Sequence, residues 1–172
     1  MRIAIVIVCW FIASWFHVAS AQDTTSSDIK HHMEKHKITV LEFHGLGVEQ
    51  SLLTSLADEA RVALLEDLHH NDFIILTHEN TLTILNDMGL PRNALEGNDA
   101  VEIGRNIHVE YIFTGTVALV DKTYIVTLKL YDTNTANLLY AKHLESKKLS
   151  KLYKRLYKAT QEGIDEHLVF TE

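Results

Sequence analysis

Residues 99–145 constrain the fold of this chain most, because their pattern predicts a short helix followed by three consecutive strands. Asp99 and Glu102 have the spacing of a capping box, in which two side chains satisfy free backbone amides at a helix start. Apolar β-branched and aromatic residues then alternate with more polar ones, which is the period of a strand with one buried face. The three predicted strands cover residues 111–117, 124–131 and 138–144, with predicted turns between them at residues 120–122 and 132–137.

The residues on either side of this meander predict the other elements. Residues 38–43 and 73–76 are short apolar runs typical of buried strands. Between them, apolar residues recur at every third and fourth position, which predicts an amphipathic helix over residues 50–70. Thr77 can cap a further helix, and a last helix begins near Leu149. The order β-α-β-α-α-β-β-β-α predicts one α+β (mixed α/β) domain, a single mixed sheet with helices packed on it.

The start of the chain has the pattern of a secretory signal peptide. A basic residue precedes the apolar stretch 3–16, and small residues follow before Gln22. We therefore expect residues 1–21 to be removed on export, residues 22–37 to form a flexible polar leader, and residues 38–168 to form the domain. An uncleaved N-terminal anchor is the alternative interpretation.

Charge and cysteine content exclude some classes of protein. The chain has 16 basic and 23 acidic residues, and Arg2 is the one charged residue before Gln22, so 15 basic and 23 acidic residues remain, a net charge of −8. This balance argues against nucleic-acid binding, which needs a clustered basic surface. The single cysteine, Cys9, lies in the predicted signal peptide and outside any lipobox. We therefore expect neither a disulfide framework nor a lipid anchor.

Three segments carry motifs that occur together in a known family. Residues 100–117 read AVEIGRNIHVEYIFTGTV, the following hairpin contains TLKLYDTNTANLL, and residues 38–48 read ITVLEFHGLGV. In this order and spacing they resemble the periplasmic family of the curli-assembly protein CsgG, the lipoprotein LpoB and the N-terminal domain of TolB. The resemblance covers roughly residues 38–164. It departs at Ala136, where the family usually has glycine.

The resemblance implies a non-catalytic, exported binding or adaptor domain of the Gram-negative cell envelope, acting in assembly or secretion as in curli assembly and transport. It implies a periplasmic location, with outer-membrane association as a further option. Its partner would be an envelope or secretion protein, or another copy of the chain, and no integral membrane span is expected in the mature chain. Because the chain has no long extra strand pairs of the kind that build CsgG-type pores, an adaptor similar to LpoB or TolB fits better.

Tyrosine is the one polar aromatic residue with a pattern along the chain. The interface candidates, which lie on or beside the meander, are Tyr111, Tyr124, Tyr131 and Tyr140. Tyrosine combines a large apolar ring with a polar tip, which suits an interface anchor. It suits a half-buried position in a sheet equally well, and both interpretations stay open.

Two other binding functions have weaker support. His31, His32 and His36 lie in a polar segment, and neutral imidazoles four residues apart on a helix can chelate Zn²⁺ or Cu²⁺. A periplasmic metal or small-ligand binding protein is therefore the alternative function, although a solvated histidine tail is the simpler interpretation. Gly45 and Gly47 lie between a strand and a helix, as in nucleotide-binding loops, but the third glycine of that motif is missing. Nucleotide binding is therefore the least favoured hypothesis, and a turn that needs glycine is the preferred interpretation of this segment.

The sequence offers little for catalysis. It contains no G-x-S-x-G segment, and no cysteine lies beyond the predicted signal peptide. Adjacent carboxylates such as Asp58 and Glu59 lie on the expected solvent face of a helix. We therefore expect that the protein is not an enzyme and has no catalytic residue and no cofactor.

Overall fold

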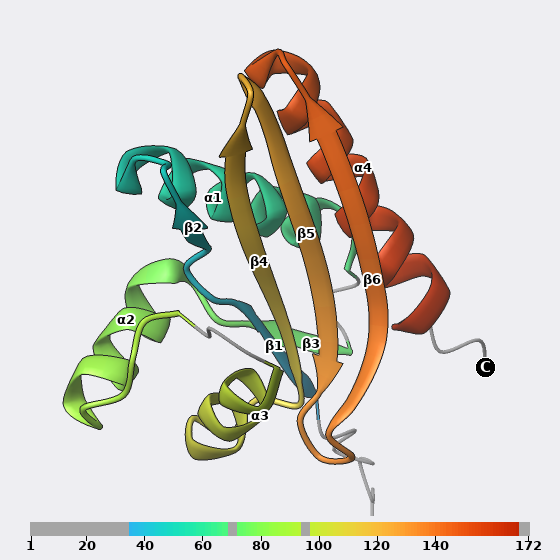
Figure 1. Cartoon of the computed structure of the whole chain (residues 1–172). Coiled ribbons are helices and arrows are strands. Elements are labelled where there is room, and N and C mark those ends of the chain that lie inside the picture. Colours follow the sequence, from blue (N-terminus) through green and yellow to red (C-terminus); the bar gives the residue numbers. More distant parts are fainter. Residues whose placement is uncertain (1–34, 69–71, 94–96, 169–172) are drawn as a thin grey trace, which may run out of the picture. The chain divides into compact units, whose positions relative to one another are not determined.

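A six-stranded mixed sheet with four helices packed on it makes up the part of the chain described in a computed structural model, residues 35–68, 72–93 and 97–168 (Figure 1). The elements, in chain order, are β1 (His36–Val40), β2 (His44–Leu46), α1 (Gln50–Asp67), β3 (Phe73–Ile75), α2 (His78–Asp87), α3 (Gly97–Asn106), β4 (Tyr111–Val120), β5 (Thr123–Asp132), β6 (Asn137–Ser146) and α4 (Leu149–His167). The predicted fold class is confirmed, and β2 is added to the predicted order. The predicted signal peptide lies outside the described residues.

The sheet combines a parallel half and an antiparallel half. Its strand order is β3-β1-β4-β5-β6, and β2 pairs with β4 beyond the end of β1. β1 runs parallel to β3 and to β4, whereas β4, β5 and β6 form an antiparallel meander. The two parallel neighbours of β1 follow from helical crossovers, and the meander follows from short turns between its strands.

Helices cover both faces of the parallel half. Neighbouring residues of a strand point to opposite faces, so they show which helices lie on each side. Ile38 and Val40 pack in the larger core cluster with residues of α1 and α4. Thr39 points the other way, and its Oγ1 lies 2.8 Å from Oγ1 of Thr81 in α2. Leu41 packs on the same side as α3 in the second core cluster. Thus α1 and α4 lie on one face, and α2 and α3 on the other.

The β4–β5 connection is a two-residue turn. Asp121 and Lys122 have φ angles of 47° and 61°, which is the pairing of positive φ angles required by a type I′ turn. This turn matches the right-handed twist of strands and fixes the register in which Val120 pairs with Thr123. The predicted turn at this position is confirmed.

Two predicted helix starts have different outcomes. Thr77 caps α2, since its hydroxyl accepts a hydrogen bond from the backbone N–H of Asn80 at 3.3 Å, so this prediction is confirmed. The prediction that Asp99 is an N-cap is wrong, because α3 begins earlier, at Gly97. Asp99 lies in the first helical turn, where its carboxylate still complements the positive end of the helix dipole.

The segment around Gly45 differs from the predicted turn. His44–Leu46 is a strand, β2, that runs parallel to β4, and the turn into α1 falls at Gly47, whose φ is +69°. Gly45 lies so close to α1 and β4 that a Cβ atom there would be 2.7 Å from a Leu53 methyl carbon and 2.9 Å from the Val117 carbonyl oxygen. Glycine is therefore needed for packing in β2, and this close approach is not visible in a local turn pattern.

Replacing Ala136 with glycine is expected to stabilise the protein by about 1 kcal/mol, because Ala136 has a φ of 59°, where a Cβ is unfavourable. Denaturant unfolding of the two proteins measures the difference. Ala141→Gly in the neighbouring strand β6 is the matched control and should lower stability by about 0.5–1 kcal/mol, since extended backbone does not need glycine. A loss of stability in both variants would contradict the prediction.

Candidate functional site

A buried polar cluster, here called the Glu42 cluster, lies at the carboxyl end of β1. Its members are Glu42, which follows β1, Thr54 and Arg61, which lie in α1, and His78, which lies in α2. Glu42 and Arg61 are each only 7% exposed. Thr54 Oγ1 donates to Glu42 Oε2 at 2.8 Å, and Arg61 Nη2 donates to Glu42 Oε1 at 3.3 Å and to the Val40 carbonyl at 2.9 Å. His78 Nδ1 lies 3.0 Å from Glu42 Oε1.

The position of the Glu42 cluster is one that often binds ligands. The chain leaves β1 through α1 on one face of the sheet and leaves β3 through α2 on the other. Ligands bind at such switch points in many open α/β sheets. Here both carboxylate oxygens of Glu42 have partners within the protein. The carboxylate therefore joins α1 and α2 to β1, whereas two nitrogens of the cluster, Arg61 Nε and His78 Nδ1, are buried without a hydrogen-bond partner among the described residues.

Sequence reasoning missed this cluster, although one signal was present. Arg61 lies within the apolar stripe of α1, next to Ala60 and one turn before Leu64, where a charge is costly unless it is paired. Its partner Glu42 is nineteen positions earlier in the chain. Only the crossover from β1 to α1 brings the two together.

The four tyrosines predicted as interface residues occupy separate environments. Tyr131 is 7% exposed and packs with α3, whereas Tyr140 is 8% exposed and packs in the core beside α4. Tyr111 and Tyr124 are half-buried. The register pairs Tyr111 with Asp132 at one end of β5, whereas Tyr124 lies at the opposite end. The four therefore do not form one surface, and an interface role for each stays a prediction.

Two of these tyrosine hydroxyl groups have raised pKa values. Burial raises the pKa of Tyr111, with a smaller effect from the negative charges of Asp132 and Glu110. The pKa of Tyr140 is raised well above its ordinary value, first by burial and then by Glu162, whose Oε2 accepts a hydrogen bond from the Tyr140 hydroxyl at 3.2 Å. Both groups remain neutral donors at neutral pH, so neither supplies a base.

The proposed metal ligands are only partly within the described residues. His31 and His32 lie outside them. His36 begins β1, where its ring contacts those of Phe73 and Tyr111, which also contact each other, and its Nδ1 contacts the Glu110 carboxylate. Within the described ranges, no group of three or more histidine, cysteine, aspartate and glutamate side chains could hold a metal ion. His36 therefore belongs to the sheet and not to a polar tail.

The face of the meander away from α4 has an uncovered part, here called the open face. Its residues follow from strand alternation and register, and are His44, Leu46, Thr116, Ala118, Ile125, Thr127, His143 and Glu145. Leu46, Ala118 and Ile125 form an apolar row across β2, β4 and β5, and Leu46 is 74% exposed. Thr127 and His143 meet in the next row, with Oγ1 and Nδ1 3.4 Å apart. The open face thus offers apolar contact beside hydrogen-bonding groups.

The strand β6 forms one edge of the sheet. Among the described strands it pairs with β5 alone, although it is ten residues long (Figure 1). Three successive residues of β6, Ala141, Lys142 and His143, are exposed. Such an edge presents unpaired backbone N–H and C=O groups and can accept a further strand.

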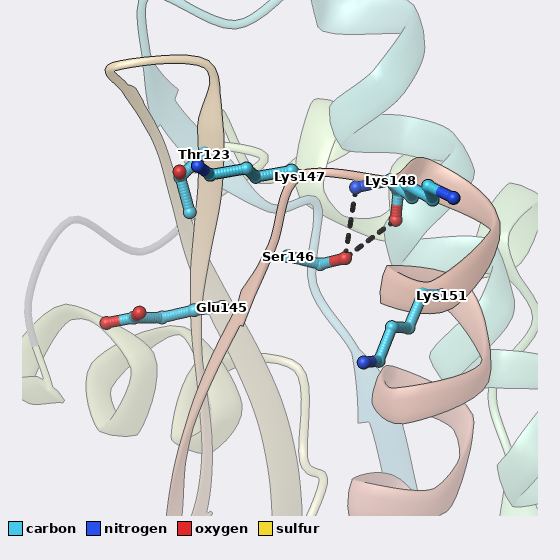
Figure 2. A pocket seen from close by; sticks show the side chains of 6 residues that line it. All are labelled: Thr123, Glu145, Ser146, Lys147, Lys148 and Lys151. Carbon is cyan, nitrogen blue, oxygen red and sulfur yellow. Dashed lines mark hydrogen bonds between the residues drawn. The ribbon is translucent and has the colours of Figure 1, made fainter.

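A pocket of about 530 Å³ opens at the junction of β6 and α4 (Figure 2). It is lined by Thr123, Glu145, Ser146, Lys147, Lys148 and Lys151. The Ser146 hydroxyl accepts from the Lys148 N–H at 3.1 Å and lies 2.8 Å from the Lys148 carbonyl oxygen, to which it donates. These bonds hold the chain in a tight bend before α4. Lys147, Lys148 and Lys151 therefore lie together at the amino end of this helix.

Comparisons with known proteins show the fold. No family model and no curated protein matches the sequence. The solved structure of lipoprotein GNA1162 from Neisseria meningitidis matches with a TM-score of 0.53 and 13% identity, over 77% of this chain and 99% of that one. TolB from Acinetobacter baumannii matches with a TM-score of 0.52 and 16% identity, over 79% of this chain and 29% of that one. The C-terminal domain of LpoB from Salmonella enterica has a TM-score of 0.48 and 14% identity, over 66% of this chain and 83% of that one.

The chain is therefore a mixed α+β domain with the fold found in GNA1162 and in part of TolB. This agrees with the part of the predicted resemblance that concerns TolB, whereas the likeness to CsgG stays a prediction. Within the residues that the structure describes, no helix has both the length and the apolar character needed to cross a membrane.

Proposed function

We propose that the protein is a non-catalytic binding domain of the cell envelope, which docks an extended segment of a partner protein on the free edge of β6. The observation that carries this proposal is that edge: ten residues of strand with a pairing partner on one side only in the described part of the sheet. A partner strand added there would gain a row of backbone hydrogen bonds, with side chains alternating between the two faces.

The open face supports the same proposal. A strand paired with β6 would continue the sheet, so alternate side chains of the partner would lie beside His143 and Glu145, which pair with Thr127 and Ile125 of β5. Leu46 lies at the far end of the apolar row, on β2, and stays exposed when a strand pairs with β6, because β4 and β5 lie between the two. The edge would supply backbone pairing, and the face would select the side chains of the partner.

Location in the periplasm is part of the proposal. It is supported by the signal-peptide pattern of residues 1–21 and by the shared fold with a protein described as a lipoprotein. The fold similarity to TolB is a second support for an envelope role. The partner is an envelope or secretion protein or a second copy of this chain.

Site-specific photo-crosslinking in the organism's own cells tests the proposal. A photoreactive residue at Ala141 on the β6 edge is expected to give a discrete covalent adduct with another protein or with a second copy. The matched control is Leu65 on α1, an apolar residue that is 50% exposed and lies away from the meander. Mass spectrometry of the Ala141 adduct identifies the partner. Adducts of equal yield at both positions, or none at either, would contradict docking at β6.

A further inference from the structure

We propose that one end of the domain is a contact surface for an anionic membrane. This surface, here called the basic tip, consists of the β4–β5 turn and the β6–α4 junction. Its basic and apolar residues are Leu119, Val120, Lys122, Lys147, Lys148, Leu149 and Lys151, and its acidic residues are Asp121 and Glu145. The occupant is a bilayer with phosphate headgroups, and this contact is separate from the protein docking proposed at β6.

Two connections far apart in the sequence form the basic tip. The register pairs Val120 with Thr123 at the turn and pairs Tyr124 with Ser146, so the turn lies beside the end of β6. Figure 1 shows the β4–β5 turn, the end of β6 and the start of α4 at the same end of the meander. In Figure 2 the Lys147 side chain extends across to Thr123, which places a cation between the two connections.

Positive charge is concentrated at the basic tip although the chain as a whole is acidic, with a net charge of −7. The tip has four lysines, Lys122, Lys147, Lys148 and Lys151, against Asp121 and Glu145, which leaves a net charge of +2. Among the described residues, no ion pair involves Lys147, Lys148 or Lys151. Unpaired ammonium groups at a pocket attract phosphate, and the amino end of α4 adds a partial positive charge.

The one acidic residue that lines the pocket does not neutralise these lysines. Glu145 Oε1 lies 3.1 Å from Nε2 of His143 on the open face. Figure 2 shows the Glu145 carboxylate directed away from Lys148 and Lys151. The positive charge of the pocket is therefore available to an external anion.

Exposed apolar side chains distinguish a membrane from other anions. Leu119, Val120 and Leu149 are 41%, 50% and 37% exposed, and they border the lysines at the turn and at the start of α4. Proteins that lie on a bilayer often have aliphatic side chains next to lysines. The aliphatic side chains enter the boundary of the acyl chains, and the lysines bind the headgroups. A soluble phosphate would use the lysines and leave the aliphatic residues without a role.

Vesicle binding by the full mature chain tests the inference. At about 0.15 M salt, where the Debye length is about 8 Å, we expect binding to vesicles containing phosphatidylglycerol and at least tenfold weaker binding to pure phosphatidylcholine vesicles. Lys147→Gln with Lys148→Gln should weaken binding to the anionic vesicles at least tenfold. The matched control, Lys37→Gln with Lys158→Gln, removes the same charge from exposed positions elsewhere and should change binding less than twofold.

A second variant separates insertion from charge attraction. Val120→Ser should weaken vesicle binding several-fold and leave binding of inorganic phosphate unchanged, whereas the lysine variant lowers both. Circular dichroism checks that each variant is folded. The inference is overturned if the wild type does not prefer anionic vesicles, if both lysine pairs have equal effects, or if phosphate binds at the lysines and vesicles do not. Binding of an acidic protein without vesicle binding would overturn it in favour of a protein ligand.

Discussion

Glu42→Ala is expected to lower the free energy of unfolding by about 3–5 kcal/mol, which is the cost of leaving a buried charge without its partner. Arg61 would keep its burial and lose the carboxylate that faces its Nη2. Thr54 would lose the acceptor of its hydroxyl, and His78 would lose the carboxylate that lies 3.0 Å from its Nδ1. Denaturant unfolding followed by circular dichroism measures the loss.

Asp58→Ala is the matched control for this prediction. Asp58 also binds Arg61, with Oδ1 2.5 Å from Nη1, but its side chain is 54% exposed. Water can replace an exposed carboxylate, so we expect a loss below about 1 kcal/mol. An equal loss of unfolding free energy in the two variants would show that burial does not make the Glu42–Arg61 pair stronger than the Asp58–Arg61 pair.

Gly115→Ala is expected to lower the free energy of unfolding by about 1–3 kcal/mol through overpacking. A Cβ at this position would lie 2.5–2.6 Å from three carbon atoms of the Phe43 ring, and Phe43 is completely buried in the core. The ring cannot move aside without displacing its neighbours, because packing around it is dense.

A double-mutant cycle distinguishes this contact from a general loss of strand stability. Phe43→Ala alone should cost about 3–5 kcal/mol, because it leaves a cavity. In that background the new methyl group at position 115 enters the vacated space, so the double variant should lose less than the sum of the single losses. Additive losses would mean that Gly115 is required for a reason other than the Phe43 ring.

The meander shows how far local patterns predict this fold. Alternation along residues 124–131 and the turn at Asp121 and Lys122 depend on neighbours in the chain, and both predictions are confirmed. The same holds for α2, whose cap is supplied by Thr77. The signal for β2 was weak, because a three-residue strand around Gly45 depends on the adjacent strand β4 and on Leu53 of α1.

Alternation alone did not predict which tyrosines are buried. Tyr131 and Ile125 lie on the same face of β5, yet Tyr131 is buried and Ile125 belongs to the open face. The difference comes from α3, which covers one end of that face and not the other. Alternation of apolar and polar residues identifies the two faces of a strand, but it does not show where a helix from elsewhere in the chain will pack.

The sequence by itself determined the class of fold, the order of nearly all helices and strands, and the turns of the meander, because these depend on side chains within a few positions of one another. The tertiary structure decided the contacts on which the candidate sites depend. Glu42 and Arg61 meet through a crossover, and the basic tip joins Val120 to Lys147 through strand register. Such contacts depend on the path of the chain between distant residues, so only the assembled sheet reveals them.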